Sequence, residues 1–244
     1  LASSAASDVY KRQAYLFYNV SRLKNYVIQK RGHDMSQERS EFLADMLHKL
    51  AKLDYIRPGE IPNIDLYMDQ VTTFMDEQLE ACKRYEDDKI LTKTMINNYA
   101  KNNLLPAPEK KKYSKEHVLT LLFIYYFKNL LSINDIQSLL NPLTEHYFGN
   151  KAGFNMEDVY NEVFNLESTE SEKLLKDLGK KYALSRETFR KFPENDQEFL
   201  QNFSFICLLS YDVYIKKMII ESVIDNINLS LIHISEPTRL DVIS

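Results

Sequence analysis

Glycine is scarce in this chain, and that scarcity excludes more folds than any other feature of the sequence. The 244 residues include only five glycines and seven prolines. A many-stranded β-sandwich needs such residues at its frequent turns, and a phosphate-binding loop needs a glycine-rich motif. Hydrophobic residues make up 44% of the chain, which excludes disorder as well. We therefore expect a mainly α-helical protein.

The residues that usually carry chemistry are sparse. Cys82 and Cys207 lie far apart and form neither a disulfide framework nor a zinc motif, so we expect a reducing, cytoplasmic location. No apolar run reaches the roughly 18 residues of a membrane helix, and no membrane partner is expected. The sequence contains no nucleophile elbow, phosphate loop or paired histidines at helical spacing. We expect no enzyme, no metal and no cofactor, and the sequence indicates no particular small-molecule effector.

The two ends of the chain resemble sequencing adapters rather than protein. Residues 3–13 (SSAASDVYKRQ) and 229–239 (LSLIHISEPTR) match reading-frame translations of the adapters used in transposase-based sequencing. We expect residues 1–34 to be artefact or untranslated leader, with Met35 as the natural start, and residues 229–244 to be artefact. A genuine N-terminal helix is the alternative for residues 14–34. The chain between these ends, 35–228, holds 24 basic and 31 acidic side chains, a net charge of −7.

Apolar spacing divides the chain between these ends into helices. Periodicity near 3.6 residues and the breaks at proline and glycine predict helices over 40–55, 64–84, 92–103, 114–131, 132–140, 156–166, 171–181 and 196–227. We expect Asn141-Pro142 to stop the fifth of these helices. The last helix is apolar on nearly all sides, which is typical of a buried helix or an oligomer interface. The expected regions are an N-terminal helix (35–61), a central domain (62–142) and a helical dimerisation or sensing region (143–228).

One segment has the charge and polarity of a nucleic-acid reader. Residues 92–115 hold six lysines within a chain of opposite net charge. On a helical wheel, polar side chains cover the sector from about 0° to 140°, and mostly apolar ones cover about 200° to 340°. The polar sector holds Lys93, Thr94, Asn97, Asn98 and Lys101; the opposite one holds Met95, Ile96, Tyr99, Ala100 and Asn103. Amides can pair with adenine edges, and lysines can meet phosphate or guanine. The alternative is an ordinary solvated helix face.

The order of motifs around this helix resembles the MerR-like winged helix-turn-helix. The matching stretches are 92–99 (TKTMINNY), 103–108 (NLLPAP), 111–114 (KKYS) and 131–140 (LSINDIQSLL). The stretch 62–70 (PNIDLYMDQ) more closely resembles an uncharacterised bacterial domain of unknown function. The resemblance implies a recognition helix, a small β-wing with a basic tip, and two further helices. Asn103 stands in place of the turn glycine, Asn97-Asn98-Tyr99 in place of Arg-Tyr-Tyr, and the connector 86–90 is longer than a tight turn.

The sequence therefore predicts a sequence-specific transcriptional regulator that binds double-stranded DNA, with a mainly α winged helix-turn-helix followed by an all-helical region. Residues from Thr92 to Lys101 would enter the major groove. The wing, with Lys110, Lys111, Lys112 and Tyr113, would grip phosphate. We expect a homodimer whose interface lies on the apolar helix near 199–224. The alternative is a helical interaction module that keeps the fold and does not bind DNA, which the acidic net charge favours.

Overall fold

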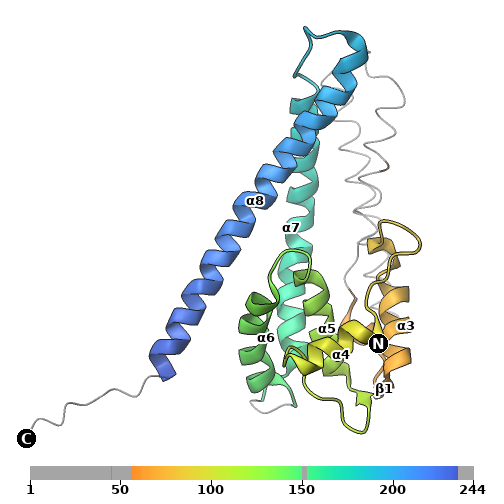
Figure 1. The fold of residues 1–244 in the computed structure, drawn as a ribbon, viewed down its shortest axis with the longest axis vertical. Helices are drawn as coiled ribbons and strands as arrows, with labels where there is room; N and C mark the ends of the chain where they lie inside the picture. The colour runs from red at the N-terminus through yellow and green to blue at the C-terminus, as the bar shows by residue number, and fades with distance from the viewer. Residues whose placement is uncertain (1–44, 46–55, 150–152, 236–244) are drawn as a thin grey trace, which may run out of the picture. The chain divides into compact units, whose positions relative to one another are not determined.

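The computed structural model describes residue 45 and residues 56–149 and 153–235 (Figure 1). The predicted helix over 40–55 and both predicted artefact ends fall wholly or largely outside these residues. The chain divides into two compact units. Of the described residues, the ribbon unit comprises 58–77, 89–149, 153–160 and 211–235, and the hairpin unit comprises 45, 56–57, 78–88 and 161–210.

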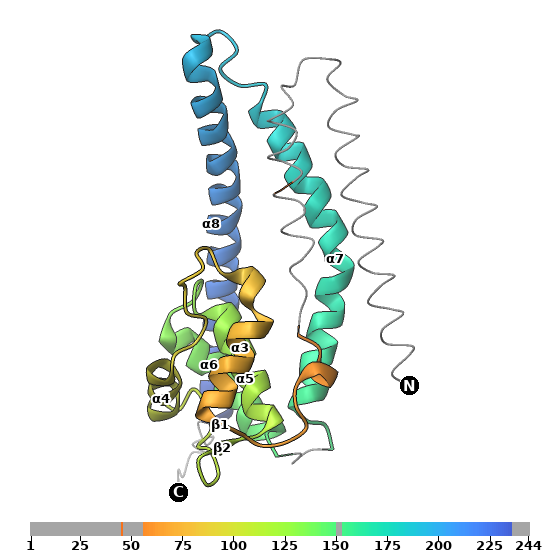
Figure 2. The same cartoon turned by 90° about the vertical axis from the view of Figure 1, so that its right-hand side faces the viewer.

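The ribbon unit begins with a short 3-10 helix η1 (Pro58–Glu60) and a two-residue strand β1 (Leu66–Tyr67). It then contains α3 (Met68–Gln78), α4 (Lys93–Lys101), β2 (Lys112–Tyr113), α5 (Lys115–Phe127) and α6 (Ile133–Tyr147). The two strands pair antiparallel, with Leu66 opposite Tyr113 and Tyr67 opposite Lys112 (Figure 2). The prediction of a mainly helical chain is confirmed for the described residues.

The first helix of this unit starts later than the sequence predicted. A helix over 64–84 was expected, but Leu66 and Tyr67 form β1 and α3 ends at Gln78, followed by a 3-10 turn η2 (Glu80–Cys82). The Gln70 side chain accepts a hydrogen bond from the Tyr67 backbone N–H at 2.8 Å, which caps α3 at this point. Pairing with a strand some 45 residues away overrides the helical pattern here, and periodicity cannot register such pairing.

The core of the ribbon unit is α5. Its residues from His117 to Tyr125 are all buried, so this helix is covered on every side. Ser114 caps it, as expected from a predicted start at that residue. Phe123 packs edge-on against Tyr160, which lies near the start of helix α7 (Met156–Ser185), with ring centroids 5.6 Å apart. Tyr126 and Phe127, which follow Tyr125, are half-buried.

Helix α6 runs through the proline that was expected to end it. Ser132 caps the helix, because its hydroxyl accepts from the Asp135 backbone N–H while the Asp135 carboxylate accepts from the Ser132 N–H. The helix then continues past Pro142 to Tyr147. A proline inside a helix costs about 3 kcal/mol. Here the buried Ile136 and Leu140 fix the preceding turns by packing, so the predicted stop at Asn141-Pro142 is wrong.

The two short helices predicted near 156–166 and 171–181 are one helix, α7 (Met156–Ser185). Leu175 and Tyr182, seven residues apart, are both buried and keep one side of α7 on the core of the hairpin unit. A glycine such as Gly179 costs a helix only about 1 kcal/mol relative to alanine. Packing of this face outweighs that cost, so the helix continues.

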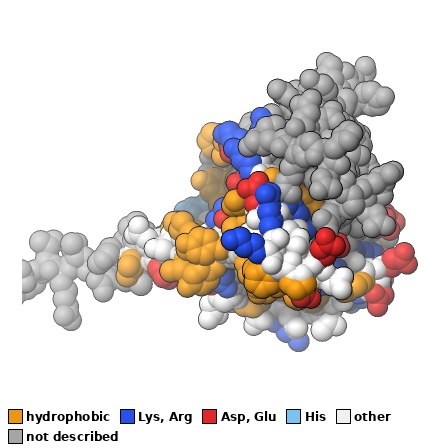
Figure 3. Space-filling model, turned by 90° about the horizontal axis from the view of Figure 1, so that it is seen from above, with side chains coloured by type: hydrophobic (Ala, Val, Ile, Leu, Met, Phe, Trp, Pro, Cys, Tyr) orange, Lys and Arg blue, Asp and Glu red, His pale blue; other side chains and the backbone are white. Residues whose placement is uncertain are grey.

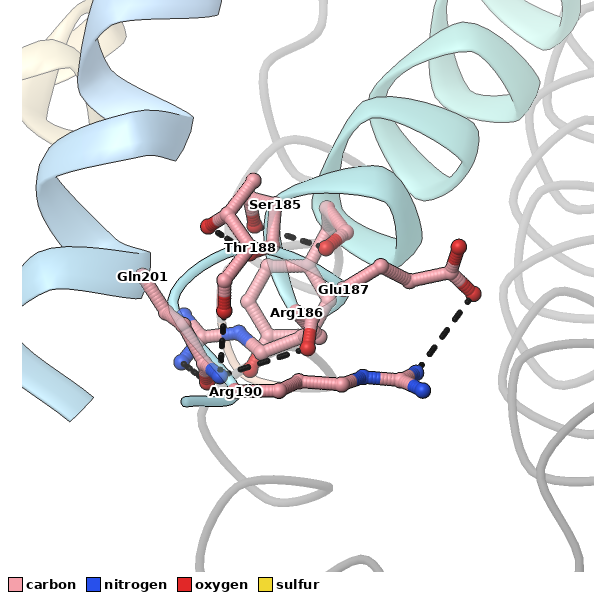
Figure 4. Close-up of polar contacts among 7 residues, drawn as sticks. Ser185, Arg186, Glu187, Thr188, Arg190 and Gln201 are labelled. Carbon is pink, nitrogen blue, oxygen red and sulfur yellow. Dashed lines mark hydrogen bonds and ion pairs between the residues drawn. The ribbon is translucent and has the colours of Figure 1, made fainter. Parts of the chain in front are cut away.

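A buried arginine organises the link from α7 to α8 (Glu194–Ser235) in the hairpin unit (Figure 4). The Arg186 guanidinium lies 4.5 Å from the centre of the Tyr182 ring and donates to Gln201 Oε1 at 3.4 Å. In return the Gln201 amide donates to the backbone carbonyls of Arg186 and Thr188, each at 3.2 Å. These contacts satisfy polar groups that are otherwise shielded from water, and they fix where α8 begins relative to the end of α7.

The long helix predicted over 196–227 is confirmed as α8, which extends to Ser235 and so continues past residue 229 (Figure 1). Among the described residues, none of the helices combines the length and apolar content that crossing a membrane requires. Many large apolar side chains of α8 are exposed, while Gln201, Phe205 and Ile224 are buried.

Candidate nucleic-acid interface

Helix α4 has one buried face and one polar, exposed face. Ile96 and Tyr99 are 0% and 6% exposed, and burial raises the pKa of the Tyr99 phenol. The exposed face consists of Lys93, Thr94, Asn97, Asn98 and Lys101. The division of faces predicted from the helical wheel is thus confirmed within α4, whereas Asn103, placed on the opposite side, is exposed beyond the helix end. Two amides, two ammonium groups and a hydroxyl lie along less than three turns of helix, free of the core.

Thr92 sets where α4 begins. Its hydroxyl oxygen accepts a hydrogen bond from the Met95 backbone N–H at 3.2 Å, and its backbone is extended. This is the usual arrangement of an N-terminal cap. Thr92 was predicted as a DNA contact; its side chain is half-buried and has this structural task.

Asn103 ends α4 in the left-handed conformation, with φ of 56°. The Leu104 N–H donates to the Tyr99 carbonyl at 2.9 Å, and the Asn103 N–H donates to the Ala100 carbonyl at 3.3 Å. Together these bonds form a Schellman motif, in which glycine is the usual residue and asparagine is tolerated. Leu104 and Leu105, 1% and 2% exposed, follow at once and anchor the turn. The position of α4 is therefore fixed at both ends.

The predicted wing is a turn of four residues that leads into β2. The Lys112 N–H donates to the Glu109 carbonyl at 2.8 Å, and the residues between them have φ of 49° (Lys110) and 65° (Lys111). Two successive positive φ angles define a type I′ turn, which normally takes Asn-Gly. Lysine is a poor residue for this backbone. Both lysine side chains are exposed at the tip.

Strand β1 supplies the other half of the ribbon. Its residues lie within the helix that the sequence predicts over 64–84. Lys112 is half-buried, and its ammonium lies 5.3 Å from the centre of the Tyr67 ring on the opposite strand. Tyr113 points the other way and is 4% exposed, with burial raising the pKa of its phenol. Of the four predicted wing residues, Lys110 and Lys111 are therefore the freest to meet a partner.

A carboxylate at the start of α3 contacts the first lysine of α4. Asp69 forms an ion pair with Lys93, and both side chains are mostly exposed. Sequence reasoning missed this acid, although it lies in the 62–70 stretch that carried the resemblance. A pair this exposed contributes little to stability, but it partly neutralises one of the five predicted lysines.

His117 supports the wing from behind. Its Nδ1 accepts from the Ser114 backbone N–H at 3.0 Å, and its ring meets Tyr113 and Phe148 edge-on. Burial lowers the pKa of His117, although the nearby backbone of Ala107 and Pro106 and the charges of Asp65 and Glu109 oppose the shift. Among the described residues, Nε2 has no hydrogen-bond partner of good geometry. Since Nδ1 accepts from the Ser114 N–H, the proton of a neutral His117 ring lies on Nε2.

Lys128 holds the segment that leads into α4. Its ammonium donates to the Ile90 carbonyl at 2.7 Å and lies 4.8 Å from the centre of the Tyr125 ring. Burial lowers the pKa of Lys128. This lysine is inside the unit and is not part of the exposed set. The basic surface thus consists of the α4 face and the turn, which Figures 1 and 2 both draw near one another.

The exposed ammonium, amide and hydroxyl groups of α4 and the turn can all donate hydrogen bonds. Within the part of the chain that the structure describes, no three or more His, Cys, Asp or Glu side chains form a group that could hold a metal ion. The ribbon and α3 to α6 define a small helical domain with a two-stranded antiparallel ribbon. Residues 56–163 match the model of a family described as a domain of unknown function (DUF1836). Comparison with curated proteins and with solved structures found no match.

Proposed function

We propose that this protein is a sequence-specific DNA-binding regulator in which α4 reads the major groove and the lysine-tipped turn grips the phosphate backbone. The observation that carries the proposal is the exposed polar face of α4, a helix that Figures 1 and 2 draw near the turn. An α-helix fits the major groove of B-DNA, and Asn and Lys are among the side chains that pair with base edges. The proposal is also supported by the order of the elements, in which a recognition helix, a wing and two further helices follow one another as in the MerR-like family.

The fixed ends of α4 favour sequence-specific contacts with bases over nonspecific electrostatic binding. The Thr92 cap, the Asn103 turn and the buried Leu104 and Leu105 hold the helix rigidly on its unit. Base contacts need such rigidity, since a hydrogen bond to a base edge weakens steeply when its geometry is poor. Phosphate contacts position the protein, and the two lysines of the turn would supply them.

The connector between α3 and α4 separates this chain from a compact helix-turn-helix. Residues 79–92 join the two helices, and within them the Asp88 carboxylate accepts from the backbone N–H groups of Arg84 and Tyr85. A single module meets few phosphates, so we expect two copies to bind a two-fold symmetric site.

The rival function is a protein-interaction module, favoured by the net charge of −7 over residues 35–228 and by the Asp69–Lys93 pair. A salt titration of DNA binding separates the two. If each turn neutralises two phosphates, Lys110→Gln with Lys111→Gln should flatten the slope of log affinity against log salt by about 1.8 per copy. The loss should be equal on preferred and scrambled duplexes. The control, Lys180→Gln with Lys191→Gln, removes two exposed lysines from the hairpin unit and should leave the slope unchanged.

Base reading has a different signature. Asn97→Ala or Asn98→Ala should leave the salt slope alone and cost about 1–3 kcal/mol only on the preferred duplex, which is selected first from a random pool. Asn129→Ala, an exposed asparagine between α5 and α6, is the control and should change nothing. If the purified protein shows no salt-dependent DNA binding at about 50 mM salt, the regulator proposal is wrong and the interaction module takes its place.

A further inference from the structure

Along one side of helix α8 runs a seam of mostly apolar side chains that the described residues leave exposed. Starting from Phe199, residues spaced alternately four and three apart run along one side of the helix: Phe199, Phe203, Ile206, Ser210, Val213, Lys217 and Ile220. This is the 3.5-residue period of a coiled-coil heptad, with Phe199, Ile206, Val213 and Ile220 at d and Phe203, Ser210 and Lys217 at a. The seam rises about 32 Å along the axis at 1.5 Å per residue.

The seam side chains are exposed to solvent. Phe199 is 72% exposed, Ile206 57% and Val213 53%. The next a position, Ile224, is 2% exposed, so the free seam ends at Ile220. Exposed hydrophobic side chains also form patches between charged ones on the face drawn in Figure 3. Contiguous apolar surface of this kind marks an interaction site.

The exposed area is sufficient for a dimer. An aromatic side chain offers about 150–250 Å² in full, and Phe199, Phe203 and Tyr214 are 72%, 53% and 60% exposed. With the aliphatic seam residues, each copy can bury about 500 Å², and two copies reach the roughly 1,000 Å² of a specific interface. A second copy presents the same seam, so it offers an apolar side chain to each apolar layer.

The charged side chains beside the seam favour a parallel over an antiparallel orientation of the two helices. Lys216 is at g and Glu221 is at the following e position. In a parallel, in-register pair of helices, g of one copy meets the following e of the other, so two Lys216–Glu221 pairs form across the interface. In an antiparallel pair g meets g and e meets e, and neither charge finds an opposite one. Parallel pairing also places Ser210 on Ser210 and Lys217 on Lys217, and such polar layers specify a dimer and its register.

We propose that two copies of this chain associate through the 199–220 seam of α8 as a parallel, in-register, two-stranded coiled coil. This inference does not rest on DNA binding, and it is tested without DNA. The long helix is continuous through the seam in Figures 1 and 2, as such pairing requires. Glu221 pairs with Lys217 at 3.4 Å within the helix. In the dimer, Glu221 would pair with Lys216 of the second copy, either in place of Lys217 or in addition to it.

The test of the interface is sedimentation equilibrium of the full chain with a matched pair of variants. Ile206 and Ile219 are 57% and 58% exposed, but Ile206 is in the seam and Ile219 is at position c. Ile206→Asp should weaken dimerisation by roughly 100-fold or more, since it buries a charge in each copy. Ile219→Asp should leave the dimer intact. A monomeric wild type at micromolar concentration, or equal effects of both variants, overturns the proposal.

Disulfide cross-linking tests the orientation and does not depend on how Ile206→Asp folds. The background for this test is a chain whose Cys82 and Cys207 are changed to Ser. In it, Ser210→Cys and Val213→Cys should each give a covalent dimer under oxidising conditions. In a parallel, in-register pair each position faces the same position of the second copy, within the roughly 7 Å between Cα atoms that a disulfide spans. Cys-to-Ser alone should give none. Cross-linking only in a mixture of the two variants would indicate an antiparallel pair and refute the parallel arrangement.

Discussion

The turn at Lys110-Lys111 should be more stable, and less able to bind DNA, when its lysines are replaced by residues that suit its backbone. Both residues hold positive φ, at 49° and 65°. A left-handed conformation costs a non-glycine residue about 1–2 kcal/mol. Lys110→Asn with Lys111→Gly relieves most of this strain, while glycine loses about 0.5–1 kcal/mol through its greater freedom in the unfolded chain. We expect a net gain of about 1–2 kcal/mol in the free energy of unfolding.

Urea unfolding followed by circular dichroism measures the gain as a higher midpoint at constant slope. The control is Lys110→Gln with Lys111→Gln, which removes the same two charges and keeps the strain, so its midpoint should not rise. Both double variants should lose the same salt-dependent DNA binding. If Asn-Gly gives no stabilisation, the strain argument is wrong. If Asn-Gly keeps wild-type DNA affinity, the lysines are not held in the turn for phosphate contact.

Three further predictions concern the supports of the interface. Burial lowers the pKa of His117 in the folded chain, so the unfolded chain takes up the proton first and stability should fall as the pH drops through about 6.5. Urea unfolding from about pH 7.5 to about pH 5 should show this loss of stability. His117→Gln, whose side chain can still accept from the Ser114 N–H, should reduce the loss. Asp69→Asn should release Lys93, strengthen DNA binding at low salt and change stability by less than about 0.5 kcal/mol; weaker binding would show that Asp69 positions the lysine. Asn103→Ala should cost about 1–2 kcal/mol in thermal unfolding while Asn103→Gly costs nothing, and equal effects would contradict the strain at this φ.

Local sequence determined helix α4 and its surface. The Thr92 hydroxyl marks its start, Asn103 marks its end, and the alternation of polar and apolar side chains between them predicted which face is buried. These features depend on residues within one or two turns of one another. Their physical causes, capping and amphipathic spacing, are therefore present in the sequence itself. Helices α5 and α8 are apolar on nearly all sides, and they were predictable from the length of their apolar runs instead.

Tertiary structure alone decided the ribbon, and with it the position of the turn. A two-residue strand has no periodicity, and Leu66 and Tyr67 become β1 only because Lys112 and Tyr113 lie beside them. The Asp69–Lys93 pair depends on the same kind of distant contact. Packing also carried α6 through Pro142, against a local preference of about 3 kcal/mol. A sequence states each residue's local preference, whereas the free energy of long-range pairing and burial exists only once the chain has folded, and at these positions it is the larger.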